Sequence, residues 1–327
     1  MVIQGLVELF VTKRMEHFNL QLGEGKSLTG RVCLPPRVSD RDNNHIPLVV
    51  CVNGGSYDAE YFDVDPEHSV ARISQALKIP VVAISRPGYG GSTSLPPITD
   101  NRSWGEQQGQ YLNTTILPAV WEHFGTRNGA TCVVLLGHSV GAMVVTIAAG
   151  SHTGTEGYPL AGLITSGIGV KYVEESRQGM IRLLGEQAET VLFEPVVKDM
   201  VMFQLPHKKL VDPRICLHTE RLNKPLTAAE LHDINFTWLG RWQKYSHAVK
   251  VPVMYGLSEL DGLWVCTPET VQEYRLAFPA SPRIESGIVP MAPHCIELSF
   301  QGPGWLSRCL GFAWECAVSN GLLVKDA

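Results

Sequence analysis

Residues 137–141 read Gly-His-Ser-Val-Gly and lie between two apolar segments. The run 132–136 predicts a buried strand, and the Gly/Ala-rich run 142–149 predicts a helix. A serine in a tight strand-to-helix turn presents its hydroxyl above the sheet, and the small residues two positions before and after it prevent a clash. The helix N-terminus places free N–H groups beside that hydroxyl. We therefore predict that Ser139 is a nucleophile. The alternative is a buried glycine turn with an incidental serine.

A serine hydroxyl needs a base within hydrogen-bond reach before it attacks a carbonyl at neutral pH. On a strand-turn-helix nucleophile, an acidic residue and then a histidine follow the serine along the chain. The sequence has eleven histidines, and His294 alone follows the apolar run 251–257. It comes just after a predicted strand at 283–289, where a loop can carry it over the sheet edge. We predict His294 as the general base, and a loop histidine without a role is the alternative.

Two acidic residues, Glu259 and Asp261, follow the run 251–257 and could stabilise a charged imidazole. Asp261 is favoured because Asp-Gly-Leu-Trp indicates a turn at that carboxylate. The other acid would then be a solvated loop residue or a supporting partner.

Acyl transfer also needs two N–H donors directed at the developing oxyanion. The residue after the nucleophile, Val140, would supply one of them. The second is expected from Asn53-Gly54-Gly55-Ser56, which follows an apolar run, and Gly55 is our choice. Paired glycines let the backbone approach a substrate closely, although a plain tight turn is the alternative.

This combination resembles the α/β-hydrolase superfamily over almost the whole chain. Asn53-Gly-Gly resembles the His-Gly-Gly oxyanion loop of that family, with Asn in place of His, and 86–92 resembles the turn after its next strand. The segments 61–64, 86–92 and 261–264 together are similar to fungal hydrolases associated with natural-product pathways. The resemblance implies a Ser-His-Asp hydrolase of the α/β-hydrolase fold, and the serine disfavours the dehalogenase and epoxide-hydrolase branches.

The remaining pattern predicts an α/β fold with a mostly parallel central sheet. Continuously apolar runs indicate strands that are buried on both faces, and four occur at 47–52, 80–85, 131–136 and 251–257. Helical patterns separate them or follow them at 69–77, 104–124, 269–277 and 305–318. A further run at 160–166 ends this alternation of strands and helices. Alternation at 16–22 and 28–34 predicts an antiparallel edge hairpin. Helices should therefore cover both faces of the sheet.

The block 171–248 interrupts this alternation with helical patterns broken by prolines, which predicts a helical cap inserted into a core of 1–170 and 249–327. Its aromatic residues could form the roof of an apolar pocket or the interior of the cap: Phe193, Phe203, Phe236, Trp238 and Trp242. Its basic residues predict a solvated face: Lys208, Lys209, Arg214 and Arg221.

Composition excludes several classes of partner. A net charge of -5 without a basic stripe gives nucleic acid nothing to bind. Eight cysteines without CxxC or zinc spacing indicate reduced thiols and no metal, and we expect no cofactor. The N-terminus lacks a basic segment before its apolar residues, so a cytoplasmic location is expected. The apolar stretch 132–150 fits strand, turn and helix better than a membrane span. The oligomeric state stays open, with a homodimer as one candidate.

Together these features predict hydrolysis of an ester, thioester or lactone of a mid-sized hydrophobic acyl substrate through an acyl-enzyme. Two alternatives remain. The same three residues could cleave carbon–carbon bonds or cyclise a substrate, or the chain could be a catalytically silent small-molecule-binding protein.

Overall fold

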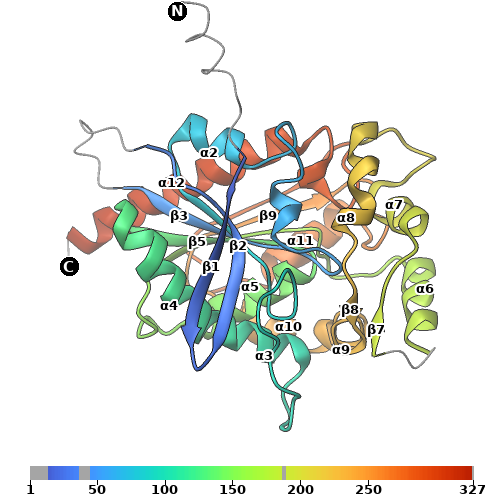
Figure 1. Ribbon diagram of the computed structural model, residues 1–327, viewed down its shortest axis with the longest axis horizontal. Helices are drawn as coiled ribbons and strands as arrows, with labels where there is room; N and C mark the ends of the chain where they lie inside the picture. The colour runs from blue at the N-terminus through green and yellow to red at the C-terminus, as the bar shows by residue number, and fades with distance from the viewer. Residues whose placement is uncertain (1–13, 37–44, 186–188, 326–327) are drawn as a thin grey trace, which may run out of the picture.

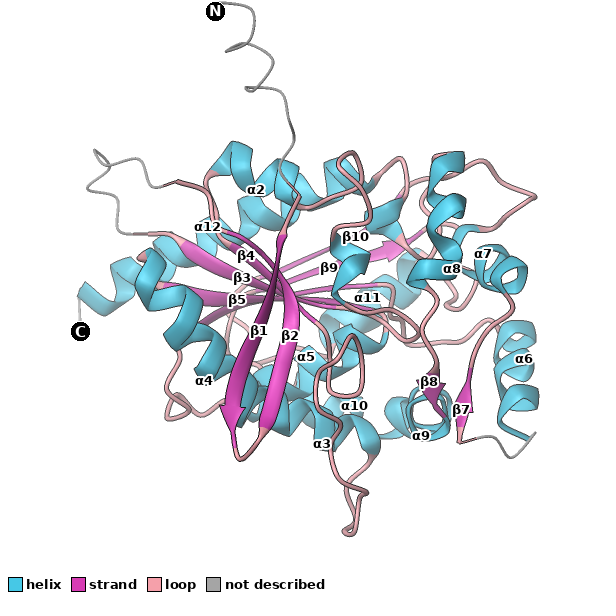
Figure 2. Ribbon diagram, in the orientation of Figure 1, coloured by secondary structure: helices cyan, strands magenta, loops and turns pink. Residues whose placement is uncertain are grey.

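The computed structural model describes residues 14–36, 45–185 and 189–325, and its centre is an eight-stranded sheet (Figures 1 and 2). The strand order is β1-β2-β4-β3-β5-β6-β9-β10. The bounds are β1 Glu16–Gly23, β2 Lys26–Cys33, β3 Pro47–Val52, β4 Val81–Ile84, β5 Cys132–His138, β6 Leu160–Ser166, β9 Val253–Ser258 and β10 Ile284–Val289.

Parallel pairing runs through the sheet from β4 to β10, and β1 and β2 add an antiparallel hairpin at one edge. Every residue of β3, β4, β5, β6 and β9 is buried, as expected for central parallel strands covered on both faces. The prediction of a mostly parallel α/β sheet is therefore confirmed, and the hairpin forms where the alternating pattern placed it.

Successive side chains of a strand point to opposite faces, so β3 contributes to two separate cores. Leu48 and Val50 pack on the face covered by α5, whereas Val49 and Cys51 pack on the face covered by α12. The helices of the first face are α3 (Trp104–Tyr111), α4 (Leu117–Val120), α5 (Val140–Ser151), α10 (Trp238–Ser246) and α11 (Pro268–Leu276). Those of the second face are α2 (Ala71–Leu77) and α12 (Gly302–Lys325). All eight cysteines are free.

Between β6 and β9 the chain is mainly helical. It forms α6 (Glu174–Gly185), α7 (Pro195–Phe203), α8 (Thr219–Leu222) and α9 (Ala228–His232), with a short pair β7 (Thr190–Val191) and β8 (Leu226–Thr227). These elements gather at one end of the sheet, on the right in Figure 1. Within the predicted cap, α10 differs, because its Trp238 and Trp242 pack in the main core beside α5. The cap boundaries themselves remain predictions.

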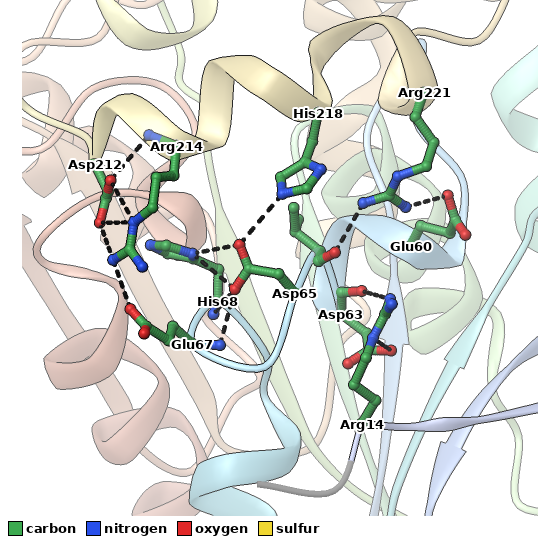
Figure 3. Close-up of polar contacts among 11 residues, drawn as sticks. Arg14, Glu60, Asp63, Asp65, Glu67, His68, Asp212, Arg214, His218 and Arg221 are labelled. Atoms are coloured by element: carbon green, nitrogen blue, oxygen red, sulfur yellow. Dashed lines mark hydrogen bonds and ion pairs between the residues drawn. The ribbon is translucent and has the colours of Figure 1, made fainter.

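Contacts between charged or polar side chains on the surface join the cap to the core segment 60–67, which begins in η2 (Ala59–Phe62), as Figure 3 shows. The pairs are Arg214 with Glu67 at 2.6 Å, Arg221 with Glu60 at 2.6 Å and His218 with Asp65 at 3.4 Å. Arg214 and Arg221 are partly exposed, in line with the predicted solvated face, and in addition they reach across to core carboxylates. Among the described residues, no helix is long and apolar enough to cross a membrane.

Candidate active site

Ser139 occupies the turn between β5 and α5 with backbone angles φ 55° and ψ -122°. This is a conformation that a residue other than glycine rarely adopts, so the surroundings must hold it. The Ser139 N–H donates to the Ser166 carbonyl oxygen at 2.8 Å. Glycine is required at 141, because a Cβ there would overlap the carbonyl oxygen of Val52 in β3. The turn at Ser139 therefore needs the backbone of α5 at Gly141 to lie directly against the backbone of β3 at Val52.

Three predicted side chains meet at this turn. Ser139 Oγ lies 3.0 Å from His294 Nε2, and His294 Nδ1 lies 3.0 and 2.9 Å from the two Asp261 carboxylate oxygens. The carboxylate fixes the tautomer with the proton on Nδ1, so Nε2 is free to accept from the serine hydroxyl. The side chains of His294 and Asp261 are almost completely buried, which strengthens their hydrogen bond.

The two acids that the sequence left open occupy different places. Asp261 contacts His294 and also accepts the N–H groups of Leu263 and Trp264 at 2.8 and 3.2 Å, which is the turn expected from its neighbours. Glu259 is exposed and accepts the Met291 N–H at 2.7 Å. Glu259 thus contacts the loop that carries His294, whereas Asp261 contacts the imidazole itself.

Gly55 and Val140 lie on the wall of the same cavity as Ser139. Val140 is the first residue of α5, so its N–H has no acceptor within the helix. A Cβ at Gly55 would be 3.4 Å from a side-chain carbon of Val140, so the two residues are neighbours on this wall. A Cβ at Gly54 would be 2.9 Å from Ser139 Cβ, so this loop has no room for a side chain beside the serine.

The Arg86 guanidinium group donates hydrogen bonds to the carbonyl oxygens of Asn53 and Gly54, at 3.0 and 2.9 Å, and so holds the 53–56 loop. The same guanidinium pairs with Glu230 of α9 at 2.7 Å, and Glu230 also accepts the Tyr89 hydroxyl at 2.7 Å. The side chains of Arg86 and Glu230 are buried. The resemblance at 86–92 includes Arg86, but the sequence did not predict Glu230, because no local pattern marks a cap residue that pairs with the core.

Lys198 of α7 holds the other end of that loop. Its ammonium group donates to the carbonyl oxygens of Ser56 and Leu222 at 2.7 and 3.2 Å, and it lies 3.7 Å from the centre of the Tyr57 ring. Burial lowers the pKa of Lys198 to about 7, while the surrounding oxygens and the ring face favour its charged form. This residue was also missed, since a lone lysine in a cap usually lies in solvent.

A cluster of buried polar side chains lies next to the turn that carries Ser139. His138 stacks on Tyr61 with ring centres 4.8 Å apart, and its Nδ1 lies 3.3 Å from Glu297. Glu297 accepts the hydroxyls of Ser166 and Tyr61 at 2.6 and 2.7 Å and the Trp305 indole N–H at 2.9 Å. Burial lowers the pKa of His138 well below its usual range, and the neighbouring His294 lowers it further.

The cavity beside Ser139 is mainly apolar. The cap and the turn after β9 supply most of its apolar lining, which includes Met180, Phe193, Met202, Leu226, Leu231 and Leu263. Of the five aromatic residues named in the sequence analysis, Phe193 lines this cavity; Phe203, Trp238 and Trp242 are buried elsewhere, and Phe236 is partly exposed. Among the described residues, no group of three His, Cys, Asp or Glu side chains is placed to hold a metal ion.

The family model and the solved structures that match this chain agree on its fold. The family model described as "Alpha/beta hydrolase family" matches residues 49–299. Solved structures of similar fold include an esterase of M. tuberculosis, at 14% identity and TM-score 0.57 over 92% of both chains. The thioesterase domain of the curacin biosynthetic pathway is 15% identical with TM-score 0.52, covering 91% of this chain and 99% of that one. The N-acyl homoserine lactonase AidH is 11% identical with TM-score 0.57, covering 92% and 97%. No curated protein sequence matches the chain. At these identities the structural likeness concerns the fold alone.

Proposed function

Because the chain belongs to the alpha/beta hydrolase family, we propose that it is a serine hydrolase that uses Ser139, His294 and Asp261. One observation carries this proposal: a continuous line of hydrogen bonds runs from the Asp261 carboxylate through the imidazole to the serine hydroxyl. The line ends at the wall of an apolar cavity, where an acyl substrate can reach the hydroxyl.

The mechanism follows from that arrangement. Ser139 Oγ attacks the carbonyl carbon of an ester, thioester or lactone while its proton moves to His294 Nε2. Asp261 stabilises the resulting imidazolium, and the N–H groups of Gly55 and Val140 bind the oxyanion. The leaving alcohol or thiol takes the proton from His294 as the acyl-enzyme forms. Water, deprotonated by His294, then attacks the acyl-enzyme and releases the acid, which regenerates the serine.

The substrate class rests on the cavity. Its apolar wall favours a mid-sized hydrophobic acyl group, since burial of each methylene contributes about 0.8 kcal/mol. Esterases, a thioesterase domain and a lactonase share the fold, which supports the same set of carbonyl substrates here. The eight free cysteines support a reducing compartment and hence the cytoplasm. A part in natural-product pathways belongs to this proposal and rests on the sequence motifs at 61–64, 86–92 and 261–264.

Labelling with a fluorophosphonate probe tests the nucleophile. We expect the wild-type protein to be labelled and Ser139→Ala to lose all labelling, whereas Ser307→Ala, at an exposed serine of α12, keeps it. Labelling that persists in Ser139→Ala would remove Ser139 from the role.

Turnover tests whether the protein is a catalyst or a silent binder. The wild-type protein should release p-nitrophenol from acyl esters, and His294→Ala should abolish the release because the serine then lacks its base. Product analysis that finds a shortened carbon skeleton or a ring in place of the free acid would favour the carbon–carbon hydrolase or cyclase.

A further inference from the structure

The described residues that line the active-site cavity include one charged side chain, Arg177. It lies on α6 of the cap, and its side chain is 28% exposed. Its guanidinium group lies 5.3 Å from the ring centre of Tyr172 and 5.6 Å from that of Phe236. The two ring faces attract the cation, but they offer no hydrogen-bond acceptor to its N–H groups.

The protein itself compensates this charge only weakly. Arg177 Nε donates to the Asn235 carbonyl oxygen at 3.3 Å, and Nη1 lies 3.7 Å from a Glu174 carboxylate oxygen. Glu174 is 67% exposed, and an ion pair of that length and exposure contributes little. Arg86, by contrast, pairs with Glu230 at 2.7 Å, and both of these side chains are buried. A guanidinium has five N–H donors, so Arg177 keeps capacity for a further carboxylate.

We propose that the acyl substrate carries a carboxylate, which binds Arg177 while its ester, thioester or lactone carbonyl lies at Ser139. This inference rests on the proposed function, because it assigns a second recognition point in the same cavity. The planar guanidinium can bind both oxygens of a carboxylate, and the rings of Tyr172 and Phe236 shield part of it from water. The substrate is then an acyl chain with a reactive carbonyl at one position and an anionic group at another.

A structural part for Arg177 is the competing explanation. The residue connects α6 to the turn η7 (Asp233–Thr237) through the Asn235 carbonyl and the Phe236 ring. If that were its whole contribution, its loss would loosen the cap and lower activity toward every substrate equally. Recognition of a carboxylate instead predicts a loss that depends on the charge of the substrate.

The test compares mono-p-nitrophenyl esters of dicarboxylic acids, from succinate to suberate, with p-nitrophenyl esters of monocarboxylic acids of the same chain length. We expect the wild-type protein to prefer the anionic ester at one chain length. Arg177→Gln should lower kcat/KM for that ester about tenfold more than for its neutral counterpart, as expected for loss of a hydrogen bond to a charged group. Arg177→Lys should keep part of the preference, since lysine keeps the positive charge but lacks the planar guanidinium that binds both carboxylate oxygens.

Two further variants sharpen the result. Glu174→Gln removes the weakly paired carboxylate and should increase the preference for anionic esters. Arg182→Gln, at an exposed arginine of the same helix outside the cavity lining, should leave the preference unchanged. An equal loss on both ester series in Arg177→Gln, or a wild-type protein that prefers the neutral esters at every length, would overturn the inference.

Binding measured on Ser139→Ala separates this inference from the proposed function. Calorimetry with the intact esters reports affinity without turnover, so tighter binding of the anionic series that Arg177→Gln abolishes supports the inference even where the wild-type protein cleaves nothing. Efficient cleavage and fluorophosphonate labelling without any charge preference would leave the serine hydrolase standing and overturn the carboxylate site.

Discussion

Glu230 of the cap and Arg86 of the core form an ion pair of 2.7 Å in which both side chains are buried. The same guanidinium donates to the carbonyl oxygens of Asn53 and Gly54. The carboxylate therefore fixes the guanidinium, and the guanidinium fixes the loop that carries the proposed oxyanion donor Gly55. The cap does more than cover the cavity, because the loop beside Ser139 depends on it for position.

We expect Glu230→Gln to lower kcat about tenfold with a much smaller change in KM. The amide leaves the buried guanidinium uncompensated, so the loop shifts from the place where it stabilises the oxyanion in the transition state. Steady-state kinetics with a p-nitrophenyl ester measures this, after thermal denaturation has shown that the variant is folded at the assay temperature. Glu220→Gln, at an exposed acid of α8, serves as the matched control. A rise in KM with unchanged kcat would contradict a positioning role.

Asp261→Asn should lower kcat by three to four orders of magnitude, roughly the effect of removing the acid that orients a catalytic histidine. The amide can present an N–H to His294 Nδ1 and so favour the wrong tautomer. Glu259→Gln should change kcat less than about threefold, because Glu259 contacts the Met291 N–H and not the imidazole. Similar losses in the two variants would restore Glu259 as a candidate for the acid.

Lys198 should make the stability of the protein depend on pH. Burial lowers its pKa to about 7 in the folded state from 10.5 in the unfolded chain, so the unfolded chain binds more protons between these values. The free energy of unfolding therefore gains a contribution that rises from pH 7 toward pH 10.5. Urea unfolding at pH 7 and pH 10 should show this rise in the wild-type protein and in Lys250→Met, an exposed control, and lose it in Lys198→Met. An unchanged rise in Lys198→Met would assign the effect to other groups.

Two glycines should respond to alanine in opposite directions. Gly141→Ala places a Cβ against the Val52 carbonyl oxygen and should destabilise the fold by about 2–3 kcal/mol. Gly240→Ala lies in α10 with nothing within 4 Å of the added atom, so it should stabilise by about 0.5–1 kcal/mol. Urea unfolding monitored by circular dichroism gives both values. If alanine stabilised both positions equally, helix propensity would outweigh the contact at the serine turn, and this prediction would be wrong.

Much of the fold could be predicted because its signals are local. A fully apolar run such as β3 has no exposed face, which identifies a central strand before any partner is known. The order of Ser139, Asp261 and His294 along the chain likewise singles out one histidine. The helix expected at 104–124 is less regular than its pattern: Leu112–Ile116 and Trp121–Gly125 are π-helical turns on either side of α4. Pro118, in α4, lacks the N–H that a regular helix would use there.

The contacts that sequence analysis missed are remote in the chain. Glu230 is 144 residues from Arg86, and Lys198 is 142 residues from Ser56. Periodicity reports which face of an element is apolar, but it contains nothing about which buried charge another element will supply. The sequence did not predict Arg177 as a site residue for the same reason, since its neighbours on the wall of the cavity come from several separate segments.

The sheet pairs β6 directly with β9, so the chain leaves for the cap and returns at adjacent strands, with Thr165 beside Tyr255. The two ends of the excursion are thus held at a fixed spacing by the sheet itself. Lengthening such an excursion adds closure entropy only as the logarithm of its length, about 0.6 kcal/mol for each doubling. A segment of another length could therefore close between β6 and β9 at little entropic cost, provided that it still supplies the buried partner of Arg86 and the support of the 53–56 loop.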